Sequence, residues 1–70
     1  MTENEFLLSL GKKIKEARNA RKLTQAKLSE ISKVEKASLS RMETGTANPT
    51  VATLYKLSEA LEVPLKYFFG

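Results

Sequence analysis

The stretch that determines the fold runs from Thr24 to Gly45, with the sequence TQAKLSEISKVEKASLSRMETG. Thr24 is a favourable N-cap, and the apolar residues Ala26, Leu28 and Ile31 behind it have helical spacing. Residues 32–35 predict a short turn, and residues 36–43 predict a further helix. Gly45 suits the backbone conformation in which helices commonly end. The stretch therefore predicts two short helices joined by a tight turn.

The helix predicted over residues 36–43 has two different faces. With about 3.6 residues per turn, Leu39 and Met42 fall on one side, where they point to a core. The opposite side combines two long cations with two small residues: Lys36, Ala37, Ser40 and Arg41. This pattern is typical of an ordinary amphipathic surface helix. It also suits a helix in the major groove of DNA, where Lys and Arg donate to guanine and an alanine methyl meets thymine.

Three more helices are predicted around this stretch. The first covers residues 4–22, and the fourth begins after the N-cap Thr50. Pro64 opens the fifth, a short helix over residues 64–69. The apolar stripes are Leu7, Leu10, Ile14 and Ala17 in the first helix, and Leu54, Leu57 and Leu61 in the fourth. Without strand patterns, repeats or linkers, we expect one all-α domain of five helices over residues 1–70.

The positive charge is concentrated in one part of the chain. The whole sequence has a net charge of +4, with 12 basic and 8 acidic residues. Residues 12–41 hold ten of the basic residues and three glutamates, a net +7, and the remainder has a net charge of −3. Such a block is compatible with a solvated helix face. It is also the electrostatic signature of a surface that binds phosphates.

The composition excludes several classes of function. The sequence has no cysteine and no histidine, and all its acids are glutamates, so a thiol nucleophile, the commonest general base and the commonest metal ligand are absent. Serines and threonines are plentiful, but nothing pairs a nucleophile with a base. We therefore expect no enzyme activity, no cofactor and no metal. The acidic N-terminus and apolar runs of at most three residues predict neither a secretory signal nor a membrane segment. A cytoplasmic protein is expected, and a chain that begins at Met1 and ends after one bundle is expected to be complete.

The pattern over residues 24–31 and 34–45 closely resembles the helix-turn-helix of phage repressors of the Cro-like, or XRE, family. The likeness extends upstream to residues 14–18 and downstream to residues 48–50 and 57–63. It implies a five-helix bundle of the lambda-repressor-like DNA-binding type. In such a bundle the motif would cover residues 24–43, and the recognition helix 36–43 would lie in the major groove of DNA.

The resemblance also implies roles for residues of the recognition helix. Lys36, Ala37 and Arg41 match the positions that contact bases in the family, and Ser40 lies beside them on the same face. The segment after this helix matches one that touches the sugar-phosphate backbone, and its residues are Thr44, Thr46 and Asn48. For that segment a helix end followed by a polar loop is the plainer alternative.

Two further positions connect the predicted helices. Gln25 matches a residue that contacts phosphate and braces the recognition helix. Arg18 and Glu43 match an ion pair between the first and third helices, from which Arg18 could share its guanidinium with a phosphate. The alternative for this pair is two separate solvated charges.

The sequence departs from the family pattern at three positions. Lys33 takes a turn position often held by glycine, so we expect either a positive φ or a rearranged turn. Ser29 replaces a small apolar residue, usually alanine. Glu35 replaces the usual Ser or Thr cap of the recognition helix. Its carboxylate suits the helix dipole but lies near the expected path of DNA phosphates, which disfavours tight non-specific binding.

The leading hypothesis is a transcriptional regulator that binds double-stranded DNA at a palindromic operator as a homodimer. The candidates for the dimer contact are Leu65, Tyr67, Phe68 and Phe69, although some of them could instead close the core. Alternatives within the same fold are the antitoxin of a toxin–antitoxin module, which also holds a protein partner, and a restriction–modification controller. An alternative of another class is a protein-interaction module that docks through the aromatic tail and no longer binds DNA.

Overall fold

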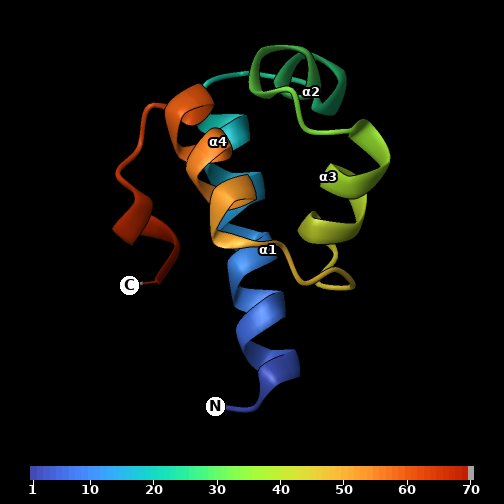
Figure 1. The fold of residues 1–70 in the computed structure, drawn as a ribbon, viewed down its shortest axis with the longest axis vertical. Helices are drawn as coiled ribbons and strands as arrows, with labels where there is room; N and C mark the ends of the chain where they lie inside the picture. Colours follow the sequence, from blue (N-terminus) through green and yellow to red (C-terminus); the bar gives the residue numbers. More distant parts are fainter. Residues whose placement is uncertain (70) are drawn as a thin grey trace.

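The computed structural model describes residues 1–69 and has the expected all-helical architecture (Figure 1). Its elements are α1 (Glu3–Ala20), α2 (Gln25–Ser32), α3 (Lys36–Glu43), α4 (Val51–Leu61) and η1 (Leu65–Phe69). The fifth element corrects one prediction, because η1 is a 3-10 helix and not an α-helix. The short segment after Pro64 closes with a three-residue hydrogen bond from the Tyr67 amide to the Pro64 oxygen, 2.9 Å long. No helix within residues 1–69 is both long and apolar enough to cross a membrane.

Threonine side chains cap three of the four α-helices. The hydroxyl oxygens of Thr2, Thr24 and Thr50 accept hydrogen bonds from backbone amides in the first turns of α1, α2 and α4. In α1 the Glu5 carboxylate also accepts from the Thr2 amide at 2.7 Å, which completes a capping box. Hydrogen bonds from the Thr2 backbone and side chain lower the pKa of Glu5 below its usual value. Glu35 stands at the N-cap of α3 without a side-chain hydrogen bond.

The buried apolar residues form a single core between the helices. Ile14, Leu28, Leu39 and Leu57, one from each α-helix, are all 0 % exposed. Phe68 joins them from η1 at 1 % exposure, so the ring named as a dimer candidate belongs to the core. Side chains three residues apart eclipse one another in a 3-10 helix. Leu65 therefore shares the inner side of η1 with Phe68.

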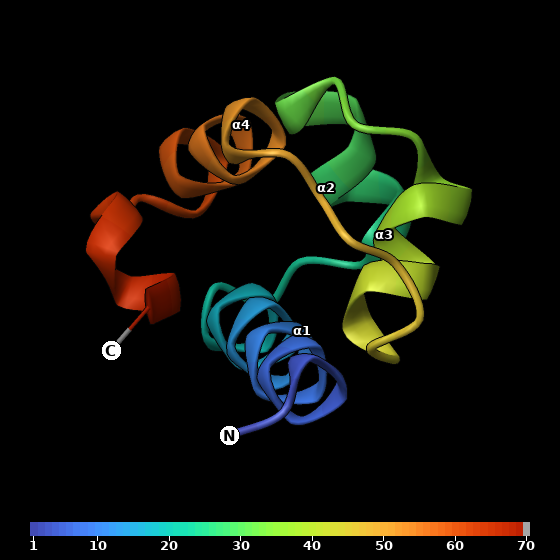
Figure 2. The same ribbon diagram turned by 60° about the horizontal axis from the view of Figure 1, so that its bottom comes forward.

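The helices α1 and α4 form the centre of the molecule, and the other elements lie on either side of them (Figures 1 and 2). Figures 1 and 2 show α2 and α3 on one side of the molecule and η1 on the opposite side of α1 and α4. At Gly11, α1 passes directly over the end of α3. A Cβ atom at this position would collide with the backbone oxygen of Met42 and lie 2.9 Å from that of Glu43. Because Gly11 has no side chain, α1 and α3 can approach each other this closely.

Three helix ends contain a lysine or glutamate in the left-handed region, where glycine is the usual residue. The φ angles are 57° at Lys22, 64° at Lys33 and 59° at Glu62. Of the two outcomes expected for the turn between α2 and α3, the positive φ at Lys33 is confirmed. Because a Cβ atom is strained in this region, these residues cost folding free energy.

Lys33→Gly should raise the free energy of unfolding by about 0.5–1 kcal/mol, since the strain at Lys33 exceeds the extra chain entropy of glycine. Urea unfolding followed by circular dichroism measures the change. Lys27→Gly, at an exposed position within α2, is the matched control and should lower stability. A fall in the unfolding midpoint of Lys33→Gly would show that the lysine is not strained there.

Candidate nucleic-acid interface

The outer face of α3 presents the four residues predicted to contact bases. Lys36, Ala37, Ser40 and Arg41 are all exposed. On the inner face, Leu39 is 0 % and Met42 6 % exposed, as the two-sided pattern predicted. The only hydrogen bond of the Arg41 guanidinium within residues 1–69 is a long one of 3.5 Å to Ser38 Oγ. The guanidinium therefore remains available to an external acceptor.

A charged network fixes the C-terminal end of α3 against α1 and α2. Arg18 Nε donates to Glu43 Oε2 at 2.7 Å, and Arg18 Nη2 donates to Glu43 Oε1 at 3.0 Å. Gln25 Nε2 donates to the same Oε1 at 3.1 Å. The side chains of Arg18 and Glu43 are only 11 % and 3 % exposed, so the pair is not two solvated charges. The network joins the first residue of α2 and the last turn of α1 to the last residue of α3.

Arg18 keeps its positive charge at every ordinary pH. The hydrogen bonds to Glu43 raise the pKa of Arg18 above its usual value, and burial opposes part of that rise. A group with a raised pKa in the folded state contributes its stability below its pKa in the unfolded chain, and loses it only above its folded pKa. Both values lie far above neutral pH for arginine, so Arg18 stabilises the fold throughout the working range.

The same contacts limit how Arg18 and Gln25 could meet a phosphate. Arg18 Nη1 donates to the backbone oxygen of Leu23 at 2.8 Å, so all three guanidinium nitrogens have acceptors inside the protein. Gln25 directs its amide nitrogen to Glu43 and is half-buried. The geometry gives both residues a bracing position. A phosphate contact would use only their remaining N–H groups.

The loop after α3 is exposed and partly tied to the helix it follows. The hydroxyls of Thr44 and Thr46 lie 3.1 and 3.2 Å from the backbone oxygen of Arg41. The Thr46 amide donates to that oxygen as well, at 2.9 Å. Because a hydroxyl has one hydrogen, either threonine must release this contact before it can donate to a phosphate. Asn48 is exposed farther along the loop.

Internal ion pairs reduce the basic surface that the sequence suggested. Arg18 pairs with Glu43, Arg21 lies 3.5 Å from Glu62, and Lys27 lies 2.9 Å from Glu30. The Lys27–Glu30 contact raises the pKa of the lysine and lowers that of the glutamate, mainly through the hydrogen bond. The bridge from Arg21 to α4, which includes a hydrogen bond to the backbone oxygen of Ala60, was not predicted. The +7 block therefore leaves fewer unpaired cations on the surface than its count of basic residues suggests.

Comparison with known proteins places this geometry in a family. A helix-turn-helix family model matches residues 14–68, so the chain belongs to the helix-turn-helix (HTH_3) family. The chain is 42 % identical over 57 residues to the HTH-type transcriptional repressor RghR of Bacillus subtilis, covering 80 % of this chain and 42 % of that protein. The chain spans between 17 % and 42 % of the length of the curated relatives it matches.

Two solved structures share nearly the whole fold. A crystal structure of an HTH_3 family transcriptional regulator from Vibrio cholerae has a TM-score of 0.91 and 32 % identity, and the match covers 97 % of this chain and 38 % of that chain. The restriction-modification controller protein C.AhdI from Aeromonas hydrophila has a TM-score of 0.87 and 27 % identity. That match covers 90 % of this chain and 96 % of the controller.

Proposed function

We propose that the protein is a transcriptional regulator that binds double-stranded DNA in a sequence-specific manner, with α3 in the major groove. The observation that carries this proposal is the exposed face of Lys36, Ala37, Ser40 and Arg41 on a helix whose C-terminal end is fixed by a partly buried ionic network. A fixed helix holds its side chains in register with base edges. The family match and the regulators among the relatives support the proposal.

The chemistry of the exposed residues indicates which part of the DNA each of them contacts. Lys36 and Arg41 donate hydrogen bonds to guanine O6 and N7, Ala37 contacts a thymine methyl, and Ser40 donates to or accepts from a base edge. Residues around α3 contact the sugar-phosphate backbone of DNA and fix the position of the helix along the groove. These are Gln25, Thr44, Thr46 and Asn48, with Arg18 as a brace that also faces the phosphates.

A homodimer on a palindromic operator completes the proposal. Two copies related by a two-fold axis would bind half-sites about 34 Å apart, or a multiple of that distance. The exposed face of α4 suits such a contact, because Val51 and Tyr55 are 63 % and 55 % exposed and lie one turn apart. Lys56 and Glu59, also exposed, supply opposite charges beside these apolar residues. Among the earlier candidates Leu65 and Tyr67 are half-buried, and only Phe69 is largely exposed.

A more specific role as a restriction–modification controller is the second candidate. It is favoured by the match to C.AhdI, which covers nearly all of that controller and of this chain. A controller would bind the promoter of its own operon. An antitoxin would bind its promoter too, and would in addition form a complex with a second protein. All three roles place the protein in the cytoplasm, where its DNA target lies, and none needs a cofactor or a metal.

Arg41→Ala should weaken binding to an operator by about 1–3 kcal/mol and leave binding to random duplex nearly unchanged. The operator is first obtained by selection from random duplexes with the wild-type chain, and affinities are measured by fluorescence anisotropy at fixed salt. Lys66→Ala removes one positive charge from η1, which lies on the opposite side of the molecule from α3 (Figure 1). It is the matched control and should weaken binding to both duplexes slightly and equally.

Two results would contradict the proposal in different ways. An equal loss of affinity by Arg41→Ala on both duplexes would make Arg41 a phosphate contact and remove it from base recognition. Failure of the wild-type chain to select any duplex at low salt would favour the protein-interaction module instead.

A further inference from the structure

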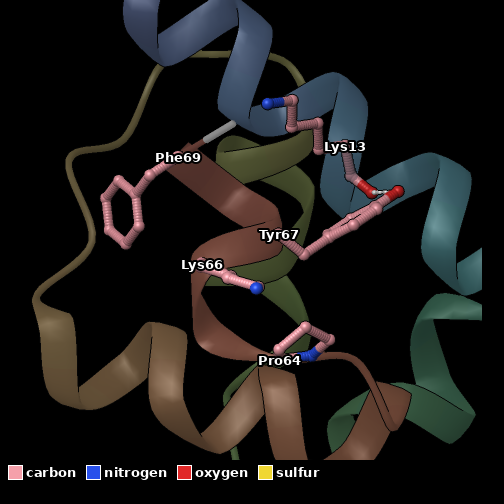
Figure 3. A pocket seen from close by; sticks show the side chains of 5 residues that line it. All are labelled: Lys13, Pro64, Lys66, Tyr67 and Phe69. Atoms are coloured by element: carbon pink, nitrogen blue, oxygen red, sulfur yellow. Dashed lines mark hydrogen bonds between the residues drawn. The ribbon is translucent and has the colours of Figure 1, made fainter.

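A shallow groove between α1 and η1 lies outside the proposed DNA surface. The groove has a volume of about 690 Å³, and the residues that line it are Lys13, Pro64, Lys66, Tyr67 and Phe69 (Figure 3). In Figures 1 and 2, η1 and α3 lie on opposite sides of α1 and α4. A molecule bound in this groove would therefore leave the exposed face of α3 accessible to DNA.

The apolar wall of the groove is held in place by the core. The ring of Tyr67 makes a T-shaped contact with the ring of buried Phe68, with ring centroids 5.6 Å apart. Its hydroxyl donates to the backbone oxygen of Lys13 at 3.4 Å, shown as a dashed line in Figure 3. Phe69 stacks on Phe6 of α1 with centroids 6.3 Å apart, and is still 52 % exposed. The rings are thus fixed in position while part of their surface faces water, which lowers the entropic cost of binding.

Lys66 gives the groove a positive charge. Lys66 and Phe69 share the outer side of η1, since residues three apart eclipse one another in a 3-10 helix. Lys66 is exposed and takes part in none of the ion pairs formed within residues 1–69. An ammonium group beside apolar rings is complementary to a carboxylate beside a large apolar side chain. A phosphate chain would match the charge and leave the rings uncovered.

A second copy of the chain fits the groove less well. In a two-fold symmetric contact the same patch of both copies meets, and the residues that line this groove include Lys66 but no acidic residue, so the contact would bring like charges together. Like charges placed opposite one another repel and select against that pairing. The α4 face with Val51 and Tyr55 carries both signs of charge and does not have this conflict.

We propose that this groove binds a short segment of another protein, in which one or more carboxylates stand next to a large apolar side chain. The carboxylate lies on the Lys66 ammonium. Apolar groups of the segment cover Tyr67 and Pro64 on one side of Lys66 and Phe69 on the other (Figure 3). Because the groove and α3 lie on opposite sides of the molecule, the segment binds without displacing DNA. The groove thereby gives this helical domain a means of bringing a second protein to its binding site on DNA.

Selection of short random peptides displayed on phage against the full chain tests the proposal. Enriched peptides should combine Asp or Glu with Phe, Trp or Leu. Synthetic copies should bind Lys66→Glu and Phe69→Ala about tenfold more weakly than wild type, by fluorescence anisotropy. Lys15→Glu, the same charge change at an exposed position of α1, should bind them almost as well as wild type. Affinity of Lys66→Glu for the selected operator should stay close to that of wild type, which separates this proposal from the DNA-binding function.

Three results would overturn the proposal. The first is that no peptide is enriched. The second is that the enriched peptides bind wild type, Lys66→Glu and Lys15→Glu equally, since a general attraction to a basic protein would explain that. The third is that Phe69→Ala converts a dimer into a monomer in sedimentation experiments, because a second copy would then occupy the groove.

Discussion

Glu43→Ala is expected to lower the free energy of unfolding by about 2–3 kcal/mol, a large share of the stability of a 70-residue chain. The substitution leaves the Arg18 guanidinium, 11 % exposed, without the carboxylate that accepts two of its hydrogen bonds. It also removes the acceptor of the Gln25 amide. Breaking one side of a buried pair costs more than the pair itself contributes, because the remaining charge stays desolvated. Urea unfolding followed by circular dichroism measures the loss.

Two control variants separate the causes of this loss. Glu30→Gln removes a carboxylate from an exposed pair, Lys27–Glu30, and should leave the unfolding midpoint unchanged within error. The double variant Arg18→Met with Glu43→Leu removes both buried charges and should recover most of the stability lost in Glu43→Ala. If Glu43→Ala unfolds no earlier than Glu30→Gln, the network seen at the end of α3 contributes nothing to folding.

The same variants test whether the network positions the recognition helix. In the double variant the core regains apolar packing, yet the bidentate contact that fixes the end of α3 is gone. Operator affinity of the double variant should therefore stay below that of wild type even when the protein is fully folded. Full recovery of both stability and operator affinity would show that the network has a structural role alone.

The sequence predicted the helices well because their ends are marked by local chemistry. Thr24 and Thr50 are N-caps as expected, and the boundaries of the third helix agree with the structure. The capping box of Thr2 and Glu5 was missed, although a threonine followed three residues later by glutamate is its signature. The positive φ at Lys33 was one of two expected outcomes, since the resemblance to the family marked that turn position.

The sequence did not show which aromatic rings of the C-terminal segment are buried, or which acceptors the arginine side chains contact. Tyr67, Phe68 and Phe69 are adjacent and similarly apolar, so only the 3-10 geometry of η1 decides which ring enters the core. The pair of Arg18 and Glu43 came from the resemblance, because 25 residues separate its members and no local pattern links them. The hydrogen bond from Arg21 to Ala60 spans 39 residues, and neither a local pattern nor the family resemblance predicted it.

Gly11 is another residue that the sequence did not single out, and its replacement should have the second large effect. Gly11→Ala adds a Cβ atom that collides with the Met42 backbone oxygen and approaches that of Glu43 to 2.9 Å. Alanine is the better helix former by about 1 kcal/mol, which works against the damage. Both neighbouring atoms belong to the backbone, so relief requires α1 and α3 to move apart. We expect a net loss of about 2 kcal/mol in the free energy of unfolding.

The separation forced by Gly11→Ala should also reach the DNA surface. The collision lies at the last two residues of α3, one of which is Glu43, so displacement of that turn strains the contact with Arg18 and reorients the face that carries Arg41. Operator affinity should fall further than the unfolded fraction explains, while affinity for random duplex falls less. Asn19→Ala is the matched control, since it adds the same helix former at an exposed position of α1 and should be neutral or stabilising. If Gly11→Ala is as stable as Asn19→Ala, the close contact between the backbones of α1 and α3 at Gly11 is contradicted. That contact would then not explain how the recognition helix is held in position.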